Sequence, residues 1–264
     1  MGILNWINPE DYSFNCTLMF ERFQLNWVLG ATDPALRRAL GIALKRNPAA
    51  AWYFARRCPE RADAVDALIA EAPDAGDEEA RQAEIDALGA FEDFVIYTTP
   101  EVMAARCPFI YGWDKARLFE MADFEGKTVL DVGAGSGRLA FAAAERAAWV
   151  YAVEPVGTLR EFLRDEAARL GVKNMRVTDG LCQCLPYPDD TFDIVMSGHV
   201  VGDDPDAEIA ELARVARPGG WLLDCPGDQP QNPGPRDFLL SRGWEEMKYT
   251  GSFGQPVYRY RKQV

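Results

Sequence analysis

Two groups of residues in this sequence have the types and spacing of a cofactor site. The first is a glycine-rich turn, Asp131 to Gly137, which follows the short apolar run Thr128-Val129-Leu130. The second is Glu154, an acid that ends another apolar run, Trp149 to Val153. Glycines allow a tight turn and a close approach of the backbone to a ligand. The helix expected after the turn offers unpaired N–H groups, and an acid ending the second strand can accept hydrogen bonds from ribose hydroxyls. The predicted chemistry is binding of a nucleoside-containing cofactor.

The spacing of the glycines separates two kinds of cofactor. A dinucleotide site requires G-x-G-x-x-G, but Arg138 stands where its third glycine belongs. The pattern D-x-G-x-G-x-G instead resembles motif I of the class I S-adenosylmethionine-dependent methyltransferases, and Glu154 falls where that family keeps its ribose-binding acid. The resemblance implies S-adenosylmethionine as cofactor, with a carboxylate near its cationic sulfonium and ammonium groups. The cofactor-binding residues predicted in this region are Asp131, Gly133, Ala134, Gly135, Gly137, Glu154 and Pro155.

Two later segments extend the resemblance. The stretch from Asp179 to Asp193 is similar to the family's adenine-side loop, and it predicts adenine contacts from Leu181, Cys182 and Gln183. Leu181 departs from the family because an acid often stands there, so the contact to the adenine amino group could come from a backbone carbonyl or from Gln183. The segment Ala213 to Leu223 resembles the family's "RVLRPGG", which is a structural element.

The exit of the fourth predicted strand holds the candidate catalytic residue. Ligands of open α/β folds bind beyond the carboxyl ends of the strands, so Ser197 and His199 are expected near the transferred methyl group. His199 is the only histidine, and an ordinary pKa near 6.5 suits a general base. The alternative is a structural or substrate-orienting role. No Asp/Asn-Pro-Pro-aromatic motif, which amino-group and base methyltransferases of the family often carry, follows this strand.

Strand and helix patterns predict the fold class. Apolar runs near 128–132, 149–153, 175–178, 192–197 and 220–225 alternate with helical patterns near 136–147, 157–170 and 206–216, as a parallel sheet requires. The tail from 243 to 261 has the pattern of an antiparallel hairpin. The resemblance therefore implies an α/β, Rossmann-like sheet of seven strands, mostly parallel, with an antiparallel C-terminal strand.

The first hundred residues differ in character from the rest. Asp33-Pro34 and Asn47-Pro48 have the form of helix starts, and the region shows no convincing strand alternation. We predict an all-helical region over 1–105, acting either as a cap over the acceptor site or as a surface for homodimer association, and a methyltransferase domain over 106–264. Tyr111, just before the first strand, is a further predicted cofactor contact because family members often place upstream residues there, with a helix-packing role as the alternative. Trp113 is either a cofactor contact or a helix-packing residue.

Composition narrows the substrate and the surroundings. The net charge of −13 repels phosphate backbones, which disfavours nucleic acid and favours a small-molecule methyl acceptor. No apolar run is long enough to cross a membrane, and the N-terminus lacks a signal-peptide pattern, so a cytoplasmic location without a membrane partner is expected. The six cysteines lack the usual zinc spacing, and no metal site is predicted.

The predicted function is S-adenosylmethionine-dependent methyl transfer by in-line displacement. Two alternatives remain open at this stage. Motifs report cofactor binding, so the chain could be a non-catalytic S-adenosylmethionine-binding protein. The cysteine count, including the pair Cys182 and Cys184, also allows a thiol-dependent metalloid methyltransferase.

Overall fold

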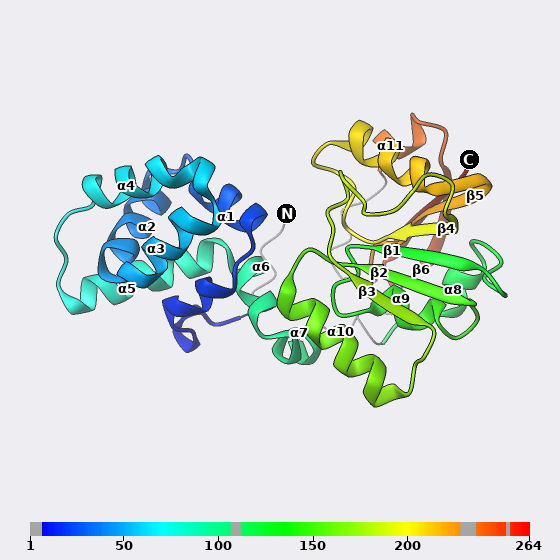
Figure 1. Ribbon diagram of the computed structural model, residues 1–264, viewed down its shortest axis with the longest axis horizontal. Helices are drawn as coiled ribbons and strands as arrows, with labels where there is room; N and C mark the ends of the chain where they lie inside the picture. The colour runs from blue at the N-terminus through cyan, green and yellow to red at the C-terminus, as the bar shows by residue number, and fades with distance from the viewer. Residues whose placement is uncertain (1–6, 107–111, 228–235, 252–253) are drawn as a thin grey trace. The chain divides into compact units, whose positions relative to one another are not determined.

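The computed structural model describes residues 7–106, 112–227, 236–251 and 254–264. The chain divides after Arg106 into two compact units, Met1–Arg106 and Cys107–Val264, which we call the helical unit and the sheet unit (Figure 1).

Helices account for all the regular structure described in the helical unit, residues 7–106. Asp33 starts α2 as predicted, because its side chain accepts the N–H of Ala35 at 3.2 Å. Asn47 precedes α3 but makes no side-chain cap bond; its amide donates to Glu84 at 2.6 Å instead. Between α5 and α6 the helix is interrupted at Phe91, whose φ and ψ of −127° and 39° are not helical. The elements are η1 (Pro9–Asp11), η2 (Phe14–Met19), α1 (Arg22–Leu29), α2 (Pro34–Arg46), α3 (Pro48–Arg57), η3 (Pro59–Arg61), α4 (Ala62–Glu71), α5 (Asp77–Ala90), α6 (Glu92–Val95), η4 (Ile96–Thr98) and α7 (Pro100–Arg106).

The sheet unit contains one seven-stranded sheet of order β3-β2-β1-β4-β5-β7-β6. Strands β1 to β5 are parallel, and β7 runs antiparallel between β5 and β6. This arrangement confirms the predicted fold class, including the antiparallel C-terminal strand. The elements are α8 (Ala116–Phe119), β1 (Thr128–Val132), α9 (Arg138–Ala143), β2 (Trp149–Val153), α10 (Gly157–Leu170), β3 (Met175–Thr178), β4 (Phe192–Ser197), α11 (Pro205–Val215), β5 (Ala216–Asp224), α12 (Asp237–Leu240), β6 (Glu245–Thr250) and β7 (Pro256–Gln263).

Alternating side chains of the central strands build a separate core on each face of the sheet. In β1, Val129 packs into the core that contains α9 and part of α10, whereas Leu130 and Val132 pack into the core that contains α11. Figure 1 shows α11 on one side of the sheet and α10 on the other. Because both faces are covered, the central strands are apolar on both sides, which explains their continuous apolar runs in the sequence. The covered faces leave the carboxyl ends of the strands as the place where polar residues gather.

Candidate functional site

The glycine-rich turn between β1 and α9 is held against the end of β2. The N–H groups of Gly133 and Ala134 both donate to the carbonyl of Val153, at 2.9 and 3.1 Å. Gly133, Gly135 and Gly137 have φ of 66°, 56° and 93°, in the left-handed region that glycine adopts without a steric penalty. A Cβ built on Gly135 meets no atom within 4 Å, so the turn borders open space at this residue. The turn is therefore a glycine cradle, held to β2 at Gly133 and Ala134 and open at Gly135.

Gly137 gives the turn its contact with the core. A Cβ on this residue lies 2.4 Å from the ring of Phe141 and 2.8 Å from Leu163. We expect Gly137→Ala to lower the free energy of unfolding by about 2–4 kcal/mol, because it combines a left-handed φ with overpacking. Gly171 is the matched control, since its φ is 69° but its Cβ meets nothing within 4 Å. Gly171→Ala should cost about 1–2 kcal/mol. Urea denaturation of both variants measures the difference, and equal losses would contradict the packing argument.

Glu154 connects the end of β2 to the glycine-rich turn. Its carboxylate accepts the backbone N–H groups of Gly135 and Val156, each at 2.9 Å, and the residue is 4% exposed. Burial raises the pKa of this carboxyl to about 7, although the hydrogen bonds from Val156 and Gly135 act in the opposite direction. Each carboxylate oxygen can accept a second hydrogen bond. Glu154 can therefore hold the turn and accept ribose hydroxyls together.

Asp131 lies in β1, one residue before the end of the strand, and is 1% exposed. Burial raises the pKa of its carboxyl to about 7, and the nearby Arg138 charge offsets part of that rise. Neither oxygen of this carboxyl has a described donor at full hydrogen-bonding geometry, although the backbone N–H of Ala140 lies close enough to lower its pKa. Buried polar atoms in native proteins are nearly always paired. A buried carboxyl without a fully formed hydrogen bond, beside a glycine cradle, fits a ligand that brings a donor or a positive charge.

Arg138, the first residue of α9, is a site residue that the sequence reasoning used only to exclude a dinucleotide. Its Nη2 donates to the carbonyl of Cys225, just beyond β5. Burial is the largest influence on the pKa values of Asp131, Asp224 and His199, and the Arg138 charge lowers all three. The guanidinium thus acts on ionisable groups from three strand ends. Its position directly after the last glycine of the motif was the signal that could have revealed it.

The predicted adenine-side loop is a tight turn after β3. Leu181 is 41% exposed, whereas Cys182 is buried and burial raises the pKa of its thiol to about 12. The Gln183 amide donates to Glu208 of α11 at 2.9 Å, and the other Glu208 oxygen accepts the N–H of Gly202 at 2.8 Å. Glu208 therefore ties this loop to the one that follows β4. The adenine contacts of the three loop residues stay predictions.

The exit of β4 is more enclosed than the sequence suggested. Ser197 is 0% exposed, and its carbonyl accepts the N–H of Cys225 at 2.7 Å. Its hydroxyl is buried, and the contact with the transferred methyl group stays a prediction. His199 has a left-handed φ of 66°, and its Nε2 accepts the N–H of Gly227 at 2.8 Å. Both residues link β4 to the chain after β5.

The remaining predicted contacts differ in their burial and in what they pack against. Ala134 is buried within the turn, and Pro155 is half-buried directly after Glu154. Trp113 is buried and packs in the core beside α9, with the Arg138 guanidinium carbon 4.9 Å from its ring centroid. Tyr111 lies outside the described residues.

Comparison with known proteins identifies the family of the sheet unit. Residues 130–224 match the family described as methyltransferase domain. The crystal structure of a SAM-dependent methyltransferase from Aquifex aeolicus has the same fold, with a TM-score of 0.52 and 21% identity over 64% of this chain and 98% of that chain. The sheet unit is a class I S-adenosylmethionine-dependent methyltransferase domain.

Curated relatives resemble this chain over part of their length. YcgJ of Bacillus subtilis, named an uncharacterized methyltransferase, is 29% identical over 134 residues, which are 50% of this chain and 53% of that protein. UbiE of Francisella tularensis, named a ubiquinone/menaquinone biosynthesis C-methyltransferase, is 27% identical over 143 residues, or 52% of this chain and 55% of that protein. The chain therefore spans about half the length of the curated relatives it matches.

The cofactor of this methyltransferase domain is S-adenosylmethionine, as predicted, and the residues present fit it. The buried carboxyl of Asp131 suits a cationic group, and the open space at Gly135 leaves room beside the turn. A nicotinamide dinucleotide would bring a negatively charged pyrophosphate to this turn, and a pyrophosphate gains nothing from a buried carboxyl.

The geometry of His199 opposes the predicted role as a general base. Its acceptor nitrogen already holds the Gly227 N–H, and burial, with the charges of Arg138 and Arg236, lowers its pKa to about 4. We expect His199→Asn to keep turnover at neutral pH within about fivefold of the wild type, since a working base contributes roughly 10²–10⁴-fold. Asparagine keeps an acceptor and tolerates a left-handed φ. Initial rates measure this effect, and a loss of about a hundredfold or more would restore the base role.

Membrane-spanning helices and clusters of metal-ligating side chains are both missing from the described residues. No helix among them is long and apolar enough to cross a membrane. No group of three or more His, Cys, Asp or Glu side chains in that part of the chain could hold a metal ion.

Proposed function

We propose that the protein transfers a methyl group from S-adenosylmethionine to a small-molecule acceptor by in-line displacement. The observation that carries the proposal is the pair of buried carboxyls, Asp131 and Glu154, at the ends of β1 and β2 beside the open glycine turn. One has no described donor at full hydrogen-bonding geometry, and the other accepts two backbone N–H groups with further acceptor capacity.

Each residue has a defined task in this proposal. The bound cofactor supplies a methyl group already activated by its sulfonium. Asp131 faces the positive charge, and Glu154 accepts hydrogen bonds from the ribose hydroxyls, which are worth roughly 1.5–3 kcal/mol each when the acceptor is charged. Arg138 donates to the carbonyl of Cys225 and so holds the segment after β5 close to the start of α9.

Positioning supplies most of the rate enhancement in this mechanism. Holding the acceptor atom in line with the methyl group can provide about 7–11 kcal/mol of the barrier reduction. His199 stays neutral at physiological pH because burial lowers its pKa to about 4. The proposal therefore favours acceptors whose reacting atom needs no strong protein base.

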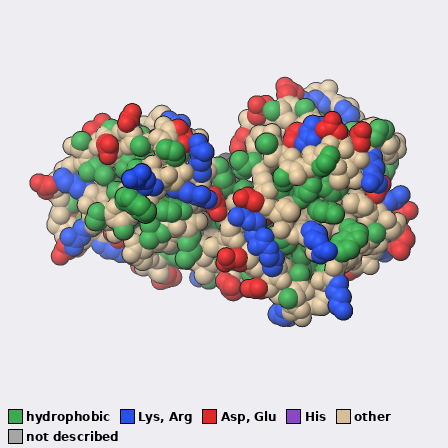
Figure 2. Space-filling view, viewed as in Figure 1, with side chains coloured by type: hydrophobic (Ala, Val, Ile, Leu, Met, Phe, Trp, Pro, Cys, Tyr) green, Lys and Arg blue, Asp and Glu red, His purple; other side chains and the backbone are tan. Residues whose placement is uncertain are grey.

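A small-molecule acceptor is supported by charge. The net charge of −13 disfavours a polyanionic acceptor. On the face in Figure 2, acidic and basic side chains are interspersed and do not form one continuous basic area. The relatives named for ubiquinone and menaquinone biosynthesis make quinone precursors the first acceptors to assay.

The thiol-dependent metalloid alternative gains no support from the described cysteines. Burial raises the pKa of Cys182 and of Cys225 to about 12, which keeps both thiols protonated. The Cys225 sulfur contacts the sulfur of Met121 at 3.4 Å, and Cys184 is exposed on the loop after β3. Among the described residues, no three His, Cys, Asp or Glu side chains are grouped so that they could hold a metal ion.

The test uses methyl-labelled S-adenosylmethionine, the full chain and a small-molecule extract that includes quinone precursors. Label transferred by the wild type and not by Asp131→Asn supports the proposal. Saturable binding of S-adenosylhomocysteine without transfer to any component indicates the non-catalytic binding protein. Binding of NADH with no binding of S-adenosylhomocysteine refutes the cofactor assignment. The cap or dimer role of residues 1–105 stays a prediction, and deleting the helical unit tests it by the change in transfer rate.

A further inference from the structure

The segment that follows β4 lies directly against the glycine turn, and we call its residues 198–202 the β4 loop. A Cβ built on Gly133 would lie 2.4 Å from Cγ2 of Val200, so a methyl group of Val200 fills the space beside the first glycine of the motif. A Cβ built on Gly198 would lie 3.0 Å from Nη2 of Arg138, the first residue of α9. The β4 loop therefore packs against both ends of the cofactor turn.

The backbone of the β4 loop is held by contacts from outside it. His199 has a φ of 66°, a conformation that is unfavourable for a residue with a side chain and persists only where surrounding contacts impose it. Its Nε2 accepts the N–H of Gly227, which follows β5, at 2.8 Å. The N–H of Gly202 donates to Glu208 of α11, also at 2.8 Å. These two bonds hold His199 and Gly202, and a third contact, from Arg236, holds the residues between them.

Arg236 joins the β4 loop to the end of β5. It lies directly before α12, and its Nη1 donates to the carbonyl of Val201 at 3.2 Å and to Oδ2 of Asp224, the last residue of β5, at 3.1 Å. The backbone N–H of Arg236 donates to the hydroxyl of Tyr260 in β7 at 2.8 Å. Because Nη1 carries two hydrogens, one guanidinium nitrogen can hold the loop carbonyl and the strand carboxyl together. The position of Val201 therefore depends on where Asp224 holds the guanidinium.

The ion pair of Arg236 and Asp224 is shielded from water. The Asp224 side chain is 0% exposed and that of Arg236 is 16% exposed. Burial raises the pKa of Asp224 to about 6, and the charge of Arg236 acts in the opposite direction, so the carboxyl is mainly ionised at neutral pH. Salt screens such a pair much less than a surface pair, and a charge-assisted hydrogen bond restricts the direction of the guanidinium. This pair is therefore suited to fixing a loop, which exposed ion pairs do weakly.

We propose that Arg236, oriented by Asp224, is a positioning residue that holds the β4 loop against the glycine turn and thereby strengthens cofactor binding. The inference rests on the proposed function for its cofactor, and Arg236 acts through the loop and not by touching the cofactor. The contact of Val200 with Gly133 keeps the turn in one arrangement, so less ordering remains to be done when the cofactor binds. Without Arg236 the loop can leave the turn, and the bound cofactor should dissociate faster.

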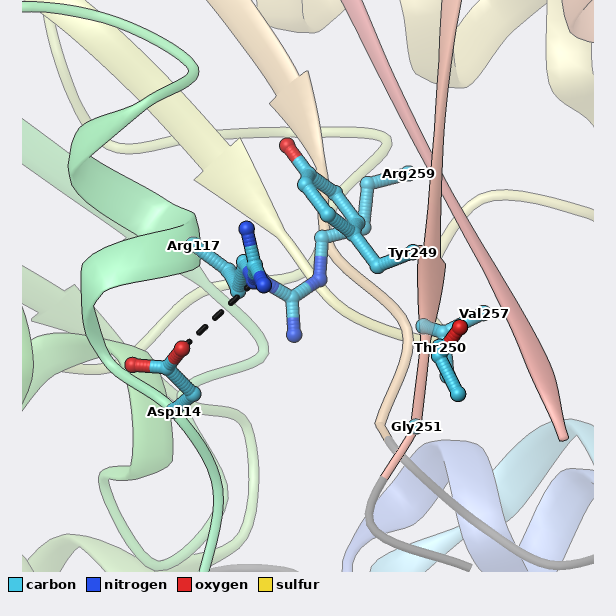
Figure 3. Close-up of a pocket in the computed structure, with 7 residues that line it drawn as sticks. All are labelled: Asp114, Arg117, Tyr249, Thr250, Gly251, Val257 and Arg259. Atoms are coloured by element: carbon cyan, nitrogen blue, oxygen red, sulfur yellow. Dashed lines mark ion pairs between the residues drawn. The ribbon is translucent and has the colours of Figure 1, made fainter. Parts of the chain in front are cut away.

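Two other arginine–carboxylate pairs of the sheet unit provide controls, because in the described chain neither arginine bonds to the β4 loop. Arg242 is the closer match, since it also joins a carboxylate to a backbone carbonyl. It pairs with Asp206 at 2.8 Å and donates to the carbonyl of Phe238 at 2.9 Å. Arg117 pairs with Asp114 at 3.5 Å beside a pocket at the C-terminal hairpin, as Figure 3 shows. No residue of the β4 loop is among the described residues that line this pocket.

The test measures the affinity of the full chain for S-adenosylhomocysteine by calorimetry at neutral pH, and its dissociation rate by stopped-flow displacement. We expect Arg236→Gln to bind at least about fivefold more weakly, mainly through faster dissociation, and Arg236→Lys, which keeps the charge, to recover part of the affinity. Val200→Ala keeps the ion pair and should bind about threefold more weakly, so it carries the test if Arg236→Gln does not fold. Combining Val200→Ala with Arg236→Gln should weaken binding by less than about twofold more, because the loop has then already left the turn. Arg242→Gln and Arg117→Gln should bind as the wild type does.

Three results would overturn the inference. They are wild-type affinity and dissociation rate in Arg236→Gln, an equal loss of affinity in Arg242→Gln, and fully additive losses from Arg236→Gln and Val200→Ala. A merely structural ion pair gives the first result together with a lower free energy of unfolding, which urea denaturation measures. Unchanged affinity in Arg236→Gln of a chain that transfers methyl groups refutes this inference alone. Weakened affinity in Arg236→Gln of a chain that transfers no methyl group to any acceptor refutes the proposed function alone.

Discussion

Replacement of Glu154 by alanine is expected to weaken the binding of S-adenosylhomocysteine at least tenfold, about 1.4 kcal/mol. Two effects act in the same direction. The variant loses the charged acceptor for the ribose hydroxyls, worth roughly 1.5–3 kcal/mol. It also loses the acceptor that holds the N–H of Gly135 at 2.9 Å, so the turn is less firmly fixed.

Isothermal titration calorimetry measures this loss, and Asp193→Ala serves as the matched control. Asp193 also accepts a backbone N–H, that of Thr128 at 2.8 Å, but it lies at the start of β4, at the opposite edge of the sheet. The control variant should lose stability without losing cofactor affinity. Unchanged affinity in Glu154→Ala would refute the assignment of Glu154 as the ribose ligand.

Local sequence signals located the central strands because their side chains are buried on both faces. The predicted runs 128–132, 149–153 and 192–197 coincide with β1, β2 and β4, and the run 175–178 coincides with β3 although that edge strand is only partly buried. Strands buried on both faces are continuous apolar segments bounded by turn residues, and neither feature depends on distant contacts. The topology then followed from the resemblance, which the sheet order confirms.

Elements whose limits depend on pairing or on left-handed backbone were predicted less well. The fifth strand was expected to start at 220, but β5 begins at Ala216, because this residue pairs with Phe192 before the register shifts. The helix expected from 136 to 147 covers only Arg138–Ala143, since Gly137 has a φ of 93° and cannot continue a helix. Pro-Gly-Gly within β5 has a turn signal that only the sheet overrides.

The sequence predicted which residues form the cofactor motif but not the burial or the pKa values of their side chains. The positions of Asp131 and Glu154 followed from spacing, but their burial and raised pKa values depend on the chains packed around them. The same holds for His199, whose acceptor nitrogen is engaged by Gly227, a residue of the segment after β5. The place of Arg138 after the last glycine marks it as a site residue, but its role comes from a carbonyl far along the chain.

The raised pKa values of Asp131 and Glu154, both about 7, make cofactor affinity depend on pH. In each case burial places the pKa of the folded protein above the ordinary value for a carboxyl, so the ligand-free protein holds protons between about pH 4 and 7. Ionisation therefore destabilises the ligand-free protein as the pH rises through this range. A cationic ligand beside Asp131 and ribose hydroxyls on Glu154 both favour the ionised forms, so binding must release protons below about pH 7.

Calorimetry of S-adenosylmethionine binding in buffers of different ionisation enthalpy counts these protons directly. Near pH 6 we expect the release of more than about one proton and an affinity at least tenfold lower than near pH 8.5, where release should approach zero. Asp131→Asn removes one titrating carboxyl, so its proton release near pH 6 should fall by up to about one while the Glu154 contribution remains. Thr178→Val, which leaves both carboxyls in place, should keep the wild-type proton count and pH profile. Binding that releases no protons near pH 6 would mean that both carboxyls are already ionised in the ligand-free protein. In that event Asp131 would be a buried anion beside the charge of Arg138. Cofactor affinity would then not depend on pH in this range.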